Sequence, residues 1–145
     1  MFRDCGAMDT TEFPGTITES LHLLVVQDVA RNRDFYTQRL GAQVIREMAG
    51  VLAFLDLAGV RLVLSAAGPG TADKPTVAFA APADPDNVSA ELILRVTDTR
   101  AVHQALAGRG VQFFTDPVDF GWEIRCYLRD PDGHLIELTQ PSSGA

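Results

Sequence analysis

Two glutamates stand in apolar, strand-like runs where a carboxylate has to be explained. Glu137 lies between Ile136 and Leu138 near the end of the chain, and Glu91 begins the run ELILRVT. A buried charge needs a partner, because an isolated one is costly to remove from water. A carboxylate in such a place can act as a general base, or as an oxygen ligand for a hard divalent ion.

Two interpretations of Glu137 are open at this point. In the first, Glu137 is a catalytic base or a metal ligand. In the second, it is a pocket carboxylate paired with Arg95 or Arg125, which lie on strands of the same half of the chain. Glu91 has the same two interpretations. If no metal ion lies between them, the proximity of the two carboxylates would raise the pKa of one and make it a candidate proton carrier.

Aromatic side chains provide a second kind of contact. Trp122 follows Phe120 and Gly121 at the start of a predicted strand, a position near a cleft rim, and is the preferred aromatic contact for a ligand. Tyr127 could stack on a flat or cationic ligand as well, as could Phe54 and Phe79. Their alternative role is core packing, which is favoured for Phe54.

The histidines and the one internal cysteine are weaker candidates. His22 is expected on the helix-packed side of its strand as a hydrogen-bonded structural residue, and His103 is expected to be solvated in a helix. His134 follows a turn and is a candidate for the cleft mouth. Cys126 has no neighbouring base in the sequence, so it is interpreted as an inert buried thiol.

The hydrophobic pattern predicts the elements that must position these residues. Helices are predicted after the capping residues Asp28 and Asp98, where side-chain oxygens can accept hydrogen bonds from the first helical turn. The helices are predicted to reach residues 40 and 109. The strands are predicted at residues 20–27, 43–47, 51–57, 60–65, 90–97, 111–114, 122–128 and 134–139, and residues 66–89 form a long connection.

The two halves of the chain repeat one another. Asp28 falls on Asp98, Gly41 on Gly110, and Gly59 on Gly133, which superimposes two βαβββ units. The predicted fold is α+β: two tandem βαβββ modules that form a curled mixed sheet around a cleft within one domain. The predicted boundaries are a domain at 18–140, with modules at about 18–66 and 89–140, between poorly ordered tails at 1–17 and 141–145.

Composition narrows the class of protein. The chain has 145 residues, 46% hydrophobic and 21% charged, which is typical of one soluble domain. No apolar run approaches membrane-spanning length, and the polar start predicts a cytoplasmic protein that does not bind membranes. The net charge of −7 argues against nucleic acid as a partner, since phosphates need a basic patch.

Three segments resemble the vicinal oxygen chelate superfamily, which includes glyoxalase I, bleomycin resistance proteins and extradiol dioxygenases. They are LHLLVVQDVARNRDFYTQRLGA at 21–42, ELILRVTDTRAVHQALAGRGV at 91–111 and RDPDGHLIELTQ at 129–140. The FY…LG and DPDG…IEL elements in combination are specific to this superfamily, and the resemblance extends from residue 20 to residue 140.

The resemblance also implies where a metal ion would bind. Metal-dependent members place ligands at four strand positions, which correspond here to Leu21, Val63, Glu91 and Glu137. The first two are aliphatic, so only two carboxylates are left to hold a hard divalent ion with water. The chain also lacks the convergent histidines that an oxygen-activating iron site of this superfamily requires.

The leading hypothesis is therefore a protein that binds a small organic molecule in a partly acidic, partly apolar cleft without a tightly held metal. Glu91, Arg95, Trp122, Arg125 and Tyr127 are its predicted contacts, with Glu137 as candidate base. The alternative is a metal-dependent lyase or isomerase of the glyoxalase type that uses Glu91 and Glu137. In small members of this superfamily a dimer often completes the cleft, so a homodimer is expected.

Overall fold

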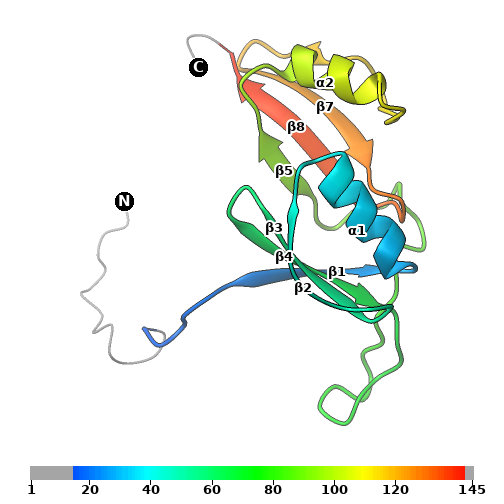
Figure 1. The fold of residues 1–145 in the computed structure, drawn as a ribbon. Coiled ribbons are helices and arrows are strands. Elements are labelled where there is room, and N and C mark those ends of the chain that lie inside the picture. Colours follow the sequence, from blue (N-terminus) through cyan, green and yellow to red (C-terminus); the bar gives the residue numbers. More distant parts are fainter. Residues whose placement is uncertain (1–14, 143–145) are drawn as a thin grey trace.

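The computed structural model describes residues 15–142, and its elements repeat in the predicted order of strand, helix and three strands (Figure 1). The first module contains β1 (Leu21–Val26), α1 (Val29–Gln38), β2 (Gln43–Met48), β3 (Leu52–Leu57) and β4 (Val60–Ala66). The second contains β5 (Leu92–Arg95), α2 (Thr99–Ala107), β6 (Val118–Asp119), β7 (Glu123–Arg129) and β8 (Leu135–Pro141). The predicted α+β fold of two βαβββ modules is confirmed.

Each module builds a mixed four-stranded sheet of the same topology. The strand order is β1-β4-β3-β2 in the first sheet and β5-β8-β7-β6 in the second. In both, the first strand pairs in parallel with the last, and the remaining pairs are antiparallel. The modules thus form two sheets that are not strongly curled, where one curled mixed sheet was expected. Helix α1 lies between the sheets, and α2 lies along the second one (Figure 1).

Both helices begin at the predicted capping residues. The Asp28 side chain accepts a hydrogen bond from the backbone N–H of Arg31 at 3.0 Å, and the Asp98 side chain accepts one from that of Ala101 at 3.1 Å. Each bond satisfies one of the free N–H groups that a helix start leaves. The matching caps fix the first turn of each helix directly after its strand.

One apolar core runs through both modules. It is formed by the side chains on the helix-covered faces of the sheets, including Leu55, Leu64, Leu128 and Ile136, each with 0% exposure. Period-2 alternation sends every second strand residue into this core and leaves the others on the opposite face. The burial of these faces decides which side chains remain available for a site.

A buried polar contact ties the modules together where α1 meets the turn between β7 and β8. The Tyr36 hydroxyl donates to Asp130 Oδ2 at 2.8 Å, and both residues are almost fully buried. In the same turn, Asp132 Oδ2 accepts from the backbone N–H of Gln27 at 2.9 Å and from Asn32 Nδ2 at 2.6 Å. The FY and DPDG segments of the sequence thus meet in space.

The predicted strand at residues 111–114 is wrong. Val111 and Phe113 pack against the core as half-buried side chains, and only one isolated bridge joins Phe113 to Leu128. Their apolar alternation therefore reflects packing of a loop rather than a ladder of hydrogen bonds. The outer strand of the second sheet is instead the short β6, which pairs with β7.

The ends of the domain differ slightly from the predicted boundaries. Pro141 belongs to β8, whereas it was predicted to begin the C-terminal tail. Most of the predicted N-terminal tail, residues 1–14, and residues 143–145 lie outside the described residues. Among residues 15–142, neither helix has the length and apolar character needed to cross a lipid bilayer.

Candidate functional site

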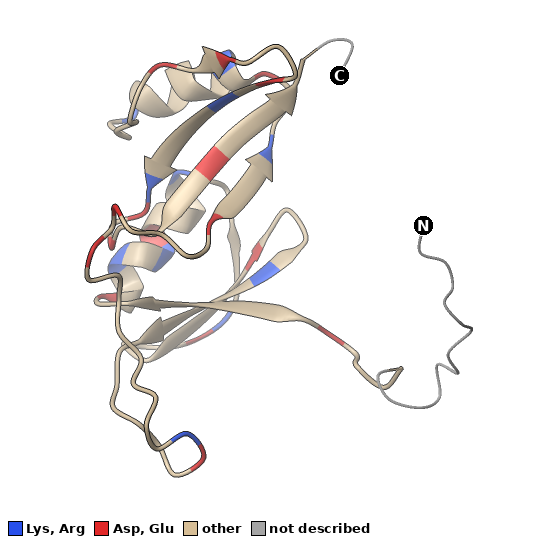
Figure 2. Cartoon of the chain, turned by 180° about the vertical axis from the view of Figure 1, so that it is seen from behind, with Lys and Arg blue, Asp and Glu red and all other residues tan. Residues whose placement is uncertain are grey.

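The second sheet has one face that no helix of the described chain covers, which we call the open face. Its side chains come from alternate positions, since α2 packs on the opposite side of β7 and β8. Ile93, Glu137 and Tyr127 are paired across β5, β8 and β7, and the next row holds Arg95, Thr139 and Arg125. Figure 2 shows this sheet from behind, with acidic and basic positions on neighbouring strands.

Glu137 lies at the centre of the open face and has a neutral partner. It is only 6% exposed, and its Oε1 accepts a hydrogen bond from the Tyr127 hydroxyl at 3.0 Å. Among residues 15–142, neither Arg95 nor Arg125 forms an ion pair with it. The predicted pairing with an arginine is therefore wrong, because Arg125 Nη1 turns to Glu123 Oε2 at 2.8 Å.

Glu91 is the second carboxylate of this face. Partial desolvation raises the pKa of Glu91, and the negative charge of Glu137 and a hydrogen bond with Glu137 raise it further. The protonation of Glu91 is thus coupled to the neighbouring Glu137. The hypothesis of a proton carrier stays a prediction.

The Tyr127 hydroxyl keeps its proton at neutral pH and is a hydrogen-bond donor to Glu137. Burial of its hydroxyl, with the hydrogen bond to Glu137 and the charge of that residue, raises the pKa of Tyr127 to about 12. A phenol with so high a pKa keeps its proton and continues to donate to Glu137. The Glu137–Tyr127 pair thus carries a full negative charge whenever Glu137 is ionised.

The Arg125 guanidinium contacts several neighbouring side chains, so its charge is largely compensated within the protein. Its guanidinium pairs with Glu123 and lies 4.5 Å from the centre of the Phe120 ring and 5.7 Å from that of Tyr127. Glu123 is held in turn by the Thr139 hydroxyl, which donates to its Oε1 at 2.7 Å, and this bond lowers the pKa of Glu123. These contacts fix the position of the Arg125 side chain on the open face.

Arg95 and Trp122 lie at the margins. Arg95 is exposed at the end of β5, with no ion pair among the described residues. Trp122 is 59% exposed, and its ring centre lies 5.6 Å from that of Phe120. The structure places Glu91, Arg125, Tyr127 and Glu137 together, whereas Arg95 and Trp122 stand apart from that group.

Sequence reasoning missed three residues of the open face: Phe120, Glu123 and Thr139. Glu123 and Thr139 follow from the same two-residue period that places Tyr127 and Glu137 on this face. Phe120 lies beyond the strand and could not be placed by periodicity. Its position depends on the short β6 and on its stacking with Arg125.

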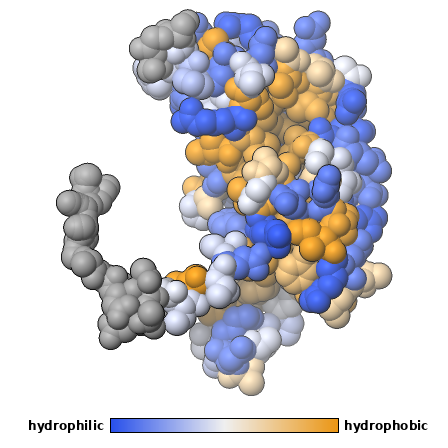
Figure 3. Space-filling view, turned by 60° about the vertical axis from the view of Figure 1, so that its left-hand side comes forward, coloured by the Kyte–Doolittle hydropathy of each residue, from blue (hydrophilic) through white to orange (hydrophobic). Residues whose placement is uncertain are grey.

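The open face of the first sheet carries large apolar side chains beside Arg61, which is paired with Glu19. Leu21 and Leu23 on β1 are 45% and 39% exposed, and Val63 lies beside Leu23 on β4. Figure 3 shows apolar side chains gathered on one side of the molecule, in a larger upper and a smaller lower area that polar residues separate. The partly acidic, partly apolar cleft stays a prediction.

The four positions at which the superfamily resemblance implies metal ligands do not fit a metal ion here. Leu21 and Val63 have no donor atom, and Glu91 and Glu137 supply only carboxylates. No group of three or more His, Cys, Asp or Glu side chains in residues 15–142 is arranged to hold an ion. Tightly bound divalent ions usually have more protein ligands than two carboxylates.

The histidines and Cys126 lie away from the open face. His22 is exposed and lacks the predicted hydrogen bond within the described chain, and His103 is packed at 4.3 Å from the Phe113 ring centre instead of being solvated. The Nε2–H of His134 donates to the Val25 carbonyl at 2.7 Å. Cys126 is 2% exposed, as predicted for a buried thiol, and burial raises its pKa to about 11.

Comparisons with known proteins agree with this architecture. Comparison with curated protein sequences finds no significant match. A glyoxalase/bleomycin resistance protein/dioxygenase from Nocardioides is similar, with a TM-score of 0.69 at 21% identity over 90% of this chain and 88% of that one.

Two further solved structures share the fold. They are a lactoylglutathione lyase from Agrobacterium tumefaciens (TM-score 0.66, 16% identity, 88% and 94% coverage) and an antibiotic binding protein from Streptomyces (0.57, 24%, 86% and 98%). The family model described as the Glyoxalase/Bleomycin resistance protein/Dioxygenase superfamily matches residues 19–138. The chain therefore belongs to the glyoxalase/bleomycin resistance protein/dioxygenase superfamily.

Proposed function

We propose that this protein binds a small organic molecule on the open face of its second sheet without a tightly held metal ion. The observation that carries the proposal is the buried Glu137, whose partner is the neutral Tyr127 rather than a cation. Glu91 adds a second carboxylate beside it. An acidic centre whose direct hydrogen-bond partner is a neutral phenol favours a ligand that brings its own positive charge or acidic proton, such as an organic amine.

The surroundings of the carboxylates favour a ligand with a flat or apolar body. Phe120 and Trp122 form an aromatic margin, and Ile93 is 53% exposed next to Glu137. Aromatic faces attract both apolar rings and cations. The proposed ligand is therefore an amine with an aromatic or aliphatic body.

A second copy of the chain supplies the other wall of the cleft in this proposal. The open faces of both sheets carry large exposed apolar side chains, among them Leu21, Leu23 and Ile93. Exposed apolar surface of this kind favours a protein interface. Pairing the apolar face of one copy with the acidic face of the other would enclose the ligand in a partly acidic, partly apolar space.

The alternative, a metal-dependent lyase or isomerase of the glyoxalase type, has the weaker support. One neighbour in fold is a lactoylglutathione lyase, but the four corresponding positions here provide only two donors. We expect less than about a tenth of an ion per chain after loading with Mn²⁺, Ni²⁺ or Zn²⁺ and desalting. A full ion per chain that is lost in Glu137→Gln would support the lyase instead.

A thermal-shift screen tests the proposal directly. Aromatic amines are compared with their neutral amide analogues, with a chelator present throughout. We expect the amines to raise the melting temperature of the wild type and to lose this effect in Glu137→Gln. Glu47→Gln is the matched control, since Glu47 pairs with Arg33 away from the open face. Equal responses in both variants, or to the neutral amides, would contradict the proposal.

A further inference from the structure

We propose a second binding site, for a small organic anion, in a groove on the opposite side of α1 from the first sheet. The groove has a volume of about 560 Å³ and lies between α1, residues 110–114 and the turn that follows β7. A volume of several hundred Å³ is typical of sites for small molecules. We call it the α1 groove.

One wall of the α1 groove is a cationic and aromatic stripe along the helix. Arg31, Phe35 and Arg39 are spaced four residues apart, so they follow one side of α1. The two arginine backbones are separated by eight residues, about 12 Å at 1.5 Å per residue. A ligand with two acidic groups joined by a flat body would match this order of charge, ring and charge.

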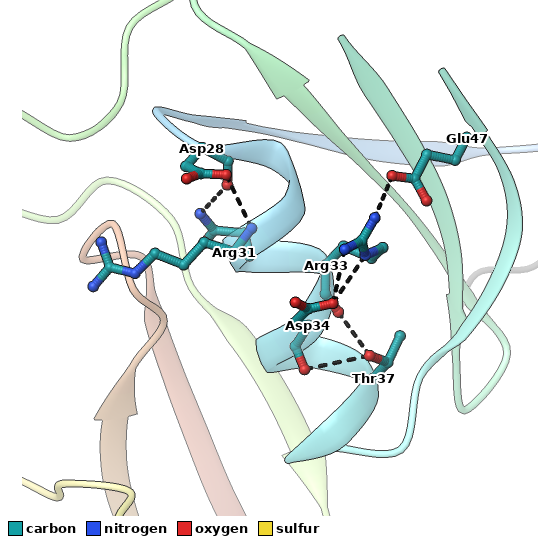
Figure 4. Close-up of polar contacts among 7 residues, drawn as sticks. Asp28, Arg31, Arg33, Asp34, Thr37 and Glu47 are labelled. Atoms are coloured by element: carbon teal, nitrogen blue, oxygen red, sulfur yellow. Dashed lines mark hydrogen bonds and ion pairs between the residues drawn. The ribbon is translucent and has the colours of Figure 1, made fainter. Parts of the chain in front are cut away.

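Neither arginine of this wall is neutralised within the described chain. Among residues 15–142, Arg31 and Arg39 form no ion pair, whereas Arg33 on another side of α1 is paired with both Asp34 and Glu47. Figure 4 shows the difference: the Arg31 guanidinium points away from the helix without a contact to the labelled residues, and Arg33 is held on two sides.

The opposite wall is also cationic and aromatic. The Arg129 guanidinium lies 4.6 Å from the centre of the Phe114 ring, and Phe113 lies beside it in the groove. Asp86 binds Nη2 of Arg129. The Nε of Arg129 is buried and has no hydrogen-bond partner among the described residues. The opposite wall thus adds aromatic surface and a guanidinium that is already paired with Asp86.

The one carboxylate that lines the groove does not cancel these charges. Asp130 is 4% exposed, and its oxygens accept from the Tyr36 hydroxyl at 2.8 Å and from the backbone N–H groups of His134 at 2.9 Å and Asp132 at 3.0 Å. Burial raises the pKa of Asp130, whereas the hydrogen bonds from Tyr36 and from the backbone of His134 and Asp132 lower it. The groove is thus lined by Arg31 and Arg39, which have no ion pair among residues 15–142, and by Arg129, which is paired with Asp86.

The chemistry of the walls indicates the class of ligand. Guanidinium groups bind carboxylates through paired N–H donors, and phenylalanine rings provide apolar surface for a flat body. The proposed ligand is an aromatic carboxylate, preferably with two acidic groups. This site is independent of the proposed amine site, because none of its three arginines contacts Glu91 or Glu137.

A titration followed by NMR tests the α1 groove, with biphenyl-4,4′-dicarboxylate as the probe. We expect backbone amide shifts to cluster at residues 31–39, 110–114 and 129–131. Biphenyl-4,4′-dimethanol, which has a similar length without charge, should cause no such shifts. Shifts confined to β5, β7 and β8, or no binding of the dicarboxylate, would overturn the proposal.

Variants separate the groove from the general charge of the protein. Arg31→Gln with Arg39→Gln should weaken binding of the dicarboxylate at least tenfold. Arg61→Gln with Arg100→Gln changes the net charge equally at positions outside the groove and should leave the affinity unchanged. Equal effects in the two double variants would overturn the proposal. Glu137→Gln should bind the dicarboxylate as the wild type does. Failure of the proposed amine site can therefore be distinguished from failure of the α1 groove.

Discussion

At the scale of single residues, the chemistry of the open face depends on the hydrogen-bond or ion-pair partner of each charged side chain. Glu137 was correctly placed among strand residues by its period, but its partner was not. Alternation assigns a side chain to a face, whereas pairing depends on rotamers and distances within that face. Arg125 forms an ion pair with Glu123, two residues away on its own strand. Glu137 instead accepts a hydrogen bond from Tyr127.

The first prediction concerns the proton affinity of Glu91. Burial and the charge of Glu137 both raise the pKa of Glu91, so Glu137→Gln, which removes that charge, should lower this pKa toward its ordinary value of 4.5. A ¹³C NMR titration of the glutamate carboxyl groups measures the change. Glu47→Gln should leave the Glu91 titration unaltered, and an unchanged pKa in Glu137→Gln would show that the two carboxylates do not interact.

The sign of the stability change follows from the same shift. The pKa of Glu91 is raised in the folded protein, so the folded state binds the proton more tightly than the unfolded state. Its contribution to stability is therefore fully present below the ordinary pKa of 4.5 and is lost as the pH rises through the folded value. Glu137→Gln should flatten this part of the stability profile.

The second prediction concerns the donor to Glu137. Tyr127→Phe keeps the ring and removes the hydroxyl, which leaves a buried carboxylate oxygen without its partner. We expect the free energy of unfolding to fall by about 1–3 kcal/mol, the usual cost of such a loss. Urea denaturation measures it. A loss no larger than that of Phe79→Leu, a change in the long connection between the modules, would contradict the assigned contact.

At the scale of elements, capping and periodicity predicted most of the fold. Asp28 and Asp98 mark both helix starts, and the internal repeat aligned the two modules correctly. Periodicity failed at residues 111–114, because half-buried loop residues produce the same apolar alternation as a strand. The α1 groove was not predicted at all, since it joins segments far apart in the sequence.

The third prediction concerns the junction of α1 with the turn after β7. Tyr36→Phe removes the donor to the buried Asp130 and should lower the free energy of unfolding by about 1–3 kcal/mol. The change is measured by urea denaturation and compared with Asp130→Asn, in which the amide can still donate to the Tyr36 hydroxyl. A Tyr36→Phe protein as stable as the wild type would show that this contact does not hold the modules together.

At the scale of the whole molecule, both sheets leave an apolar or mixed face uncovered. The sequence predicted this division, with aliphatic residues in the first module at positions where the second holds charges. It could not predict the angle between the sheets, which depends on the packing of α1 between them (Figure 1). The uncovered faces support the proposed homodimer.

The fourth prediction is the oligomeric state. We expect light scattering after gel filtration to give twice the chain mass of 15.7 kDa at micromolar concentration. Leu23→Asp places a charge on the apolar open face of the first sheet and should shift the protein to a monomer. Val44→Asp is the matched control. Val44 is similarly exposed, but it pairs with Leu55, whose side chain faces the core, so Val44 lies on the other face of the sheet. A wild-type monomer would remove the second copy from the proposed cleft.

The central claim is that the carboxylates of the open face bind a cationic organic molecule. The most direct measurement is a ¹⁵N NMR titration with the best amine from the thermal-shift screen. We predict saturable shifts at Glu91, Arg125, Tyr127 and Glu137, and at least a tenfold loss of affinity in Glu137→Gln with Glu47→Gln unchanged. Shifts elsewhere on the chain, or equal affinity in Glu137→Gln, would contradict the claim.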